Sequence, residues 1–126
     1  MFKIIESIIL KILSTPTKEP LTNDCVLLGL SDFDYSTHTI KLDKNNMMGI
    51  EYNWTSRIRI DGIRTTDKKS FKKMMDSLVD HAKYCGYNTL LFADHLDNDV
   101  LNMFLEYGFV EETGDRYNHY LTYEIN

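Results

Sequence analysis

The stretch Arg57-Ile58-Arg59-Ile60-Asp61-Gly62-Ile63 decides the fold, because it alternates charged and apolar residues as a half-buried strand does. At Gly62 such a strand can bend or bulge. Apolar residues then recur at steps of three and four, which predicts one buried face of a long helix ended by Gly86 as a left-handed cap. They are Phe71, Met74, Met75, Leu78, Val79, Ala82 and Cys85.

A second strand and helix follow the long helix. Asn88–Ala93 (NTLLFA) is a nearly continuous apolar run, which favours a parallel strand covered on both faces. The polar residues 94–99 can cap a helix at Val100–Tyr107, which Gly108 ends. A right-handed crossover would place both strands in one mixed sheet that splays open between Arg59 and Leu91, with the long helix against one face.

The flanking residues read as antiparallel strands. Cys25–Leu30 is apolar, Thr37–Leu42 alternates, and Asp43-Lys44-Asn45-Asn46 is a hairpin turn from which Met47–Tyr52 returns. Residues 109–125 predict a closing hairpin. The fold class is therefore α/β (α+β), with a mixed, mainly antiparallel sheet and helices on both faces.

The N-terminal residues 1–14 predict an amphipathic helix of a single domain that spans residues 1–126. Glu6 and Lys11 interrupt its apolar run, which argues against a transmembrane segment. The helix can pack on its own sheet, on another subunit or on a membrane surface. Because Ile4 and Leu10 widen the face, we expect it to cover its own domain and also to contribute to a protein partner contact or self-association. The main face consists of Phe2, Ile5, Ile8, Ile9, Ile12 and Leu13.

The composition excludes some functions. A net charge of −5 argues against non-specific nucleic-acid binding, and basic residues cluster only at Lys68, Lys69, Lys72 and Lys73. Cys25 and Cys85 read as buried thiols, which favours a reducing cytoplasm, and neither has a basic partner nearby in the sequence. The scattered histidines predict no metal site; they are His38, His81, His95 and His119.

The order of these elements resembles the GCN5-related N-acetyltransferase (GNAT) family over residues 37–125. The most specific local match is Phe104-Leu105-Glu106-Tyr107-Gly108-Phe109, which is similar to the aromatic-x-x-x-Gly-Phe ending of the family's last helix. The resemblance implies an acyl-CoA N-acyltransferase fold.

The turn into the long helix departs from the family. In GNAT enzymes it reads Arg/Gln-x-x-Gly-x-Gly/Ala, and its N–H groups hold the pyrophosphate of acetyl-CoA. Here Arg64 is kept, whereas Asp67 and Lys69 stand in the glycine places. Because a carboxylate repels pyrophosphate, we expect no cofactor to be bound in the usual way. If acetyl-CoA does bind, the resemblance places it on Ile63, Arg64, Lys68, Lys69 and Ser70.

The family's catalytic groups are also changed, so the catalytic residues stay unassigned. Phe104 stands where many members have a tyrosine that protonates the departing thiolate, and Tyr107 is one turn further on. The asparagine that usually opens this helix falls at Asp97. Glu51 and Asp61 are candidate general bases, although such residues on a half-exposed strand more often belong to a solvated face.

These departures also resemble the degenerate acetyltransferase-like internal virion proteins of short-tailed coliphages. Those proteins lack the glycine loop, open the long helix with Lys/Arg-Phe-Lys/Arg and have phenylalanine in place of the tyrosine. The stretch Lys69-Ser70-Phe71-Lys72-Lys73 is similar to this opening, with Ser70 between Lys69 and Phe71. Two hypotheses follow. One is a non-catalytic phage structural, ejection or host-interaction protein of the host cytoplasm or virion. The other is a divergent acetyl-CoA-dependent N-acetyltransferase.

Overall fold

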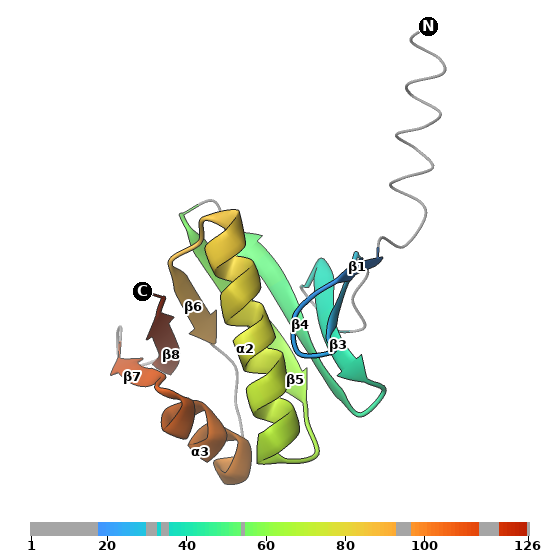
Figure 1. Ribbon diagram of the computed structural model, residues 1–126. Coiled ribbons are helices and arrows are strands. Elements are labelled where there is room, and N and C mark those ends of the chain that lie inside the picture. The colour runs from blue at the N-terminus through green and yellow to red at the C-terminus, as the bar shows by residue number, and fades with distance from the viewer. Residues whose placement is uncertain are drawn as a thin grey trace, which may run out of the picture.

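The computed structural model describes residues 18–29, 33, 36–53, 55–92, 97–113 and 119–125. Within these residues eight strands form one sheet in the order β1-β2-β3-β4-β5-β6-β8-β7, and two helices accompany it (Figure 1). The strands are β1 Lys18–Pro20, β2 Val26–Leu28, β3 His38–Asp43, β4 Asn46–Asn53, β5 Arg57–Arg64, β6 Thr89–Phe92, β7 Val110–Thr113 and β8 His119–Glu124, and the helices are α2 Lys68–Cys85 and α3 Asn98–Tyr107.

The sheet is mixed and mainly antiparallel, as predicted. The only parallel pair among the described strands is β5 with β6, in register from Arg57–Thr89 to Ile60–Phe92. β5 continues beyond this register to Arg64 along β4. The predicted placement of the two central strands in one sheet is confirmed.

A bulge interrupts the pairing of β4 with β5. Gly49 pairs with Gly62 and Ile50 pairs with Ile60, so Asp61 is the extra residue on β5. The bend suggested by the glycine in the sequence is therefore present. It changes the direction of Asp61 relative to a regular strand, which matters for the candidate site.

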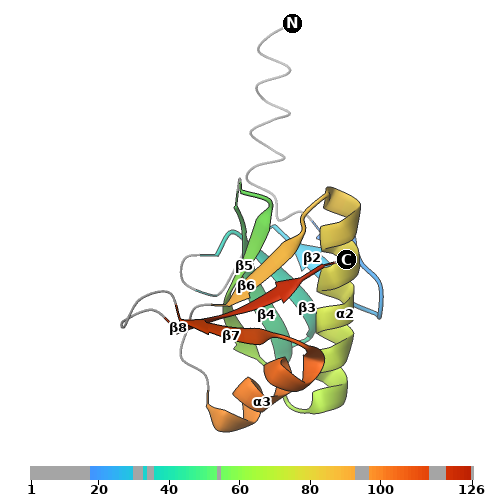
Figure 2. The ribbon, with the colours of Figure 1, turned by 90° about the vertical axis from the view of Figure 1, so that its left-hand side faces the viewer.

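Helix α2 covers one face of the sheet, as Figure 2 shows from the side. Its predicted apolar stripe is buried except at Cys85, the last residue of the helix, which is exposed. Gly86 follows in the left-handed conformation with φ of 82°, and this confirms the predicted cap. The expectation that Cys85 is a buried thiol is wrong, because the helix reaches the end of the sheet there; Cys25 is buried.

Helix α3 packs on the same face through Phe104. The Phe104 ring lies 5.0 Å from the Phe71 ring of α2, 5.0 Å from the Phe92 ring of β6 and 4.9 Å from the Phe109 ring, measured between centroids. These four side chains are all buried. The helix expected at residues 1–14 lies outside the described residues.

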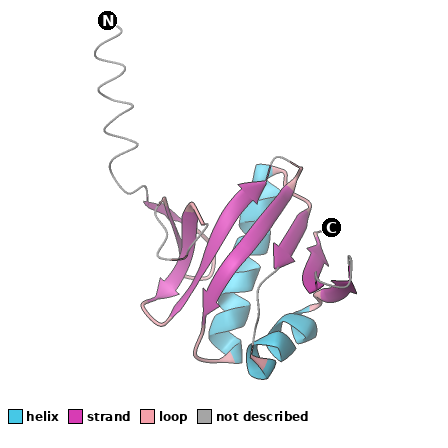
Figure 3. Ribbon diagram, turned by 180° about the vertical axis from the view of Figure 1, so that it is seen from behind, coloured by secondary structure: helices cyan, strands magenta, loops and turns pink. Residues whose placement is uncertain are grey.

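The opposite face of the sheet faces the viewer in Figure 3. Phe33 packs there on the glycine pair of β4 and β5: a Cβ on Gly62 would lie 2.4 Å from Phe33 Cδ1, and one on Gly49 would lie 2.7 Å from Phe33 Cβ. Neither glycine has a positive φ. These two glycines are therefore required for close packing and not for backbone conformation.

One of the two outer strands is not indicated by the sequence. The sequence pattern indicates no strand at residues 18–20, but β1 pairs antiparallel with β2 from Lys18–Leu28 to Pro20–Val26. Pairing with β2 creates this strand, since three residues carry no alternation of their own. At the other edge β7 pairs with β8, and this confirms the strands of the predicted closing hairpin.

Candidate functional site

The turn between β5 and α2 corresponds to the turn that holds pyrophosphate in GNAT enzymes, and the sequence predicts that its usual phosphate site is lost here. Asp67 is the N-cap of α2, and its Oδ1 accepts a hydrogen bond of 2.7 Å from the backbone N–H of Ser70. Its Oδ2 accepts from the hydroxyl groups of Thr66 and Ser70 at 2.9 and 3.3 Å. These bonds, that from Ser70 N–H above all, hold the pKa of Asp67 below its usual value. An ionised carboxylate therefore already occupies donors at this helix N-terminus.

A buried amide fixes the same turn to the β3–β4 hairpin. Asn46 is 2% exposed, and its Oδ1 accepts from the N–H of Thr66 at 2.8 Å and from the hydroxyl of Thr65 at 3.0 Å. Its Nδ2 donates to Asp43 Oδ1 at 3.0 Å. This donation is the main reason that the pKa of Asp43 is lowered. The turn geometry is thus determined by a residue twenty positions away.

The predicted cofactor-binding residues flank the turn, but they point to different partners. The Arg64 guanidinium donates to the carbonyl oxygen of Lys44 at 3.4 Å. Lys68 forms an ion pair of 2.9 Å with Glu106 of α3. Lys69 is exposed, Ser70 is bound to Asp67, and the half-buried Ile63 packs against the core. Arg64 and Lys68 thus contact different elements, the β3–β4 hairpin and α3.

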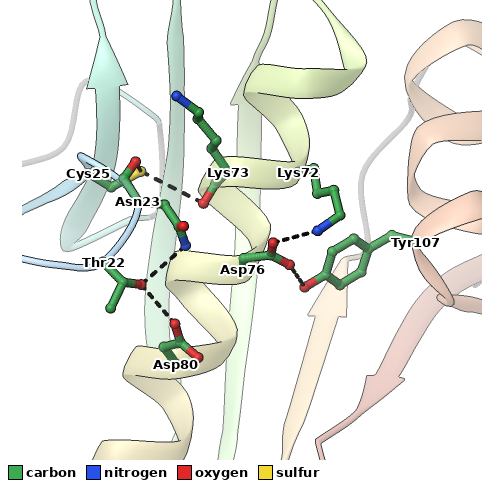
Figure 4. Close-up of polar contacts among 8 residues, drawn as sticks. All are labelled: Thr22, Asn23, Cys25, Lys72, Lys73, Asp76, Asp80 and Tyr107. Atoms are coloured by element: carbon green, nitrogen blue, oxygen red, sulfur yellow. Dashed lines mark hydrogen bonds and ion pairs between the residues drawn. The ribbon is translucent and has the colours of Figure 1, made fainter.

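Phe104, at the position of the family's tyrosine, is enclosed in the core. Phe104 is 0% exposed, and its neighbours are the aromatic rings described above. Tyr107, the alternative hydroxyl, donates a hydrogen bond of 2.7 Å to Asp76 Oδ1 of α2 (Figure 4). Burial and this bond raise the pKa of Tyr107 well above its usual value. Asp97 caps α3 by accepting from the N–H of Val100 at 2.9 Å.

Neither of the two candidate bases is fully exposed to solvent. The Asp61 side chain is 10% exposed, forms an ion pair with Arg59, and accepts from the hydroxyl of Ser36 at 3.1 Å. The bulge explains this inward position, which strand periodicity did not indicate. Glu51 lies half-buried on β4, directly opposite Arg59 in the ladder.

The fold gathers a second polar cluster that sequence reasoning missed. Tyr52 O–H and His81 Nε2 are 2.6 Å apart, and the His38 ring lies edge-on to Tyr52 at 4.9 Å. The thiol of Cys85 lies 3.8 Å from the His81 ring nitrogens, so this cysteine does have a basic neighbour. The i, i+4 spacing of His81 and Cys85 was the available signal. Burial lowers the pKa of His81 and of His38, and the partial desolvation of the Cys85 thiol raises its pKa.

The described residues show no group of three or more histidine, cysteine, aspartate or glutamate side chains arranged to hold a metal ion. His95 lies outside those residues. None of the described helices is both long and apolar enough to cross a membrane.

Comparison with solved structures defines the class of fold. The structural alignment with the ribosomal-protein-S18-alanine N-acetyltransferase of Escherichia coli covers 71% of this chain and 68% of that protein, with 11% sequence identity and a TM-score of 0.54. The alignment with the IAA acetyltransferase of Bacillus cereus covers 79% of this chain and 77% of that protein, with 13% sequence identity and a TM-score of 0.52. The alignment with a "probable acetyltransferase" of Staphylococcus epidermidis covers 83% of this chain and 70% of that protein, with 15% sequence identity and a TM-score of 0.56.

The chain therefore has the GNAT fold that its element order resembles. No family model matches the sequence, and no curated protein matches it. At these identities the likeness concerns the fold alone.

Proposed function

We propose that this protein is a non-catalytic member of the acyl-CoA N-acyltransferase fold that acts by binding a protein partner, in the manner of a phage structural, ejection or host-interaction protein. The observation that carries the proposal is the Asp67 carboxylate on the N-terminal donors of α2. A pyrophosphate would have to displace this carboxylate and would meet its charge. The residues present therefore do not fit acetyl-CoA bound through this turn.

The buried Phe104 supports the same proposal from the side of chemistry. A phenylalanine has no proton to give to a leaving thiolate, and this one is enclosed by aromatic rings. The nearest hydroxyl on α3, that of Tyr107, already donates to Asp76. No step of acyl transfer is thus supplied by this part of α3.

Calorimetric titration of the full chain with acetyl-CoA tests the proposal. We expect no binding tighter than about 1 mM, which corresponds to about 4 kcal/mol. Asp67→Gly together with Lys69→Gly should tighten binding by removing one charge and opening the backbone. Asp97→Gly is the matched control, because it removes the same kind of cap from α3 and should change nothing. Micromolar affinity of the unchanged protein would contradict the proposal, and equal tightening by Asp97→Gly would contradict the role of Asp67.

A second candidate is the divergent acetyl-CoA-dependent N-acetyltransferase. The observation that favours it is the central geometry: a parallel β5–β6 pair covers the first half of β5, and a bulge follows at Asp61. Under this alternative Arg64, Lys68, Lys69 and Ser70 would hold the phosphates beside Ile63. Continuous release of free thiol from acetyl-CoA in the presence of amine acceptors, abolished by Arg64→Ala, would favour the transferase.

A further inference from the structure

Strand β7 forms an outer edge of the sheet, and its outer side has no partner among the described strands. β7 is the last strand in the sheet order, where it pairs with β8 (Figure 1). Val110 is 59% exposed, and Glu111 and Glu112 are exposed as well. An outer strand offers N–H and C=O groups to a further strand. β7 can therefore accept an extended segment through main-chain hydrogen bonds.

The acidic residues of the chain are concentrated on the side of the molecule where β7 lies. Residues 84–126 carry eight aspartates and glutamates and one arginine, a net charge of −7. Residues 1–83 carry thirteen lysines and arginines and eleven aspartates and glutamates, a net charge of +2. The acidic part of the chain contains α3 and the strands β6, β8 and β7, which are neighbours at one end of the sheet order. The asymmetry of charge in the sequence is therefore also an asymmetry in space.

The two glutamates of β7 keep their charge available to a partner. None of the four ion pairs of the described residues includes Glu111 or Glu112, and Glu112 accepts a hydrogen bond of 3.2 Å from the neutral hydroxyl of Thr122. Glu111 is opposite Leu121, whose buried side chain belongs to the core beneath the helices, so Glu111 lies on that face of the sheet. Val110 and Glu112 lie on the other face. A strand added to β7 would therefore meet a carboxylate on each face.

This charge selects among the classes of partner. The carboxylates repel nucleic acid and an anionic membrane surface, both of which need basic residues on the protein. Two copies of β7 paired about their middle would place glutamate opposite glutamate, and like charges directly opposite each other destabilise a strand pair. Lysine or arginine opposite the glutamates stabilises it instead. The complementary occupant is therefore a basic polypeptide.

We propose that β7 binds an extended, basic segment of a protein partner, which adds to the sheet as a further strand. The segment carries an apolar residue beside Val110 and lysine or arginine beside Glu111 and Glu112. Main-chain hydrogen bonds supply affinity, and the alternate side chains supply specificity. The proposal rests on the proposed function as a partner-binding protein, and it names the surface and the chemistry of that partner.

Titration of the full chain with the hexapeptide Thr-Val-Lys-Lys-Val-Thr, blocked at both ends, tests the proposal. Its palindromic order presents valine and lysine correctly in either strand direction, and its β-branched residues favour an extended backbone. We expect a dissociation constant below about 1 mM by calorimetry, with shifted amide signals in β7 and β8. Raising the salt concentration from about 0.05 M to about 0.5 M should weaken binding at least about fivefold, because salt screens exposed charges.

Matched controls separate the contribution of charge from that of strand pairing. The hexapeptide with glutamate in place of both lysines should not bind. Of two versions methylated on alternate backbone nitrogens, at least one should lose binding, since alternate N–H groups of a strand point to the same edge. Glu111→Lys should weaken binding about tenfold. Glu19→Lys makes the same charge reversal in the middle of β1, at the other end of the sheet, and should leave the affinity unchanged.

The proposal is overturned if the hexapeptide does not bind at several millimolar, if the glutamate version binds equally, if both methylated versions bind unchanged, or if Glu19→Lys weakens binding as much as Glu111→Lys. Protection of the β7 amides from hydrogen exchange in a dimer of the chain alone would make a second copy the occupant and would also overturn it. The acetyl-CoA titration tests the proposed function separately. Micromolar binding of acetyl-CoA contradicts that function whatever the hexapeptide does, whereas failure of the hexapeptide alone contradicts only β7 as the partner surface.

Discussion

Replacing Asn46 by alanine should destabilise the whole domain, because this one amide joins two turns. The substitution removes the acceptor of the Thr66 N–H and of the Thr65 hydroxyl, together with the donor to Asp43. Each bond contributes about 1 kcal/mol net. Asp43 and Thr66 lie near solvent and can bind water instead. We therefore expect the free energy of unfolding to fall by about 2–3 kcal/mol, less than if fully buried polar groups lost their partners.

Urea denaturation followed by circular dichroism measures this loss, and the melting temperature should fall by roughly 10 °C for a domain of this size. Asn45→Ala is the control, because it makes the same chemical change at the neighbouring exposed position and should cost less than about 0.5 kcal/mol. If Asn46→Ala costs no more than Asn45→Ala, the amide does not hold the turns together.

Three further predictions follow from buried groups. The pKa of His81 lies below its usual 6.5, so the folded state resists protonation of this side chain. The contribution of His81 to stability should be constant above about pH 6.5 and should be lost as the pH falls through the folded pKa. Urea denaturation at several pH values measures this dependence, and His81→Gln should flatten it. Phe104→Tyr places a hydroxyl among buried rings and should lower the stability by about 1–3 kcal/mol without creating acetyl-CoA turnover. A stable, active variant would show that position 104 is not enclosed in the core. Gly62→Ala should cost about 1–3 kcal/mol through the clash with Phe33, and less in a Phe33→Ala background, which a double-mutant cycle would show.

Features with local signals were predictable from the sequence. The Asp43–Asn46 turn, the Asp97 cap and the Gly86 cap each depend on residues within one turn of the chain, and all three are present. The apolar periodicity of α2 also identified its buried face correctly over most of its length. Local chemistry determines these features, so an isolated sequence reveals them.

Features made by distant residues were not predictable. Helical periodicity cannot say where the sheet ends, and so it assigned a buried position to Cys85 although His81, bound to Tyr52, is the buried residue. The pairing of Asp61 with Arg59 depends on the bulge, and the hydrogen bonds that hold the Thr65–Thr66 turn come from Asn46 of the β3–β4 hairpin. The sequence indicated which residues stand near the candidate site, and their partners came from the fold.

The two outer strands of the sheet have consequences for solubility. β1 is three residues long and ends with Pro20, which has no N–H to offer to a further strand. β7 carries the exposed carboxylates of Glu111 and Glu112, whose charges repel an approaching copy at neutral pH, beside the exposed apolar Val110. Replacing both glutamates by glutamine removes these charges while β7 still offers its backbone. Aggregation of this double variant should therefore begin by strand addition at β7 and leave β1 untouched.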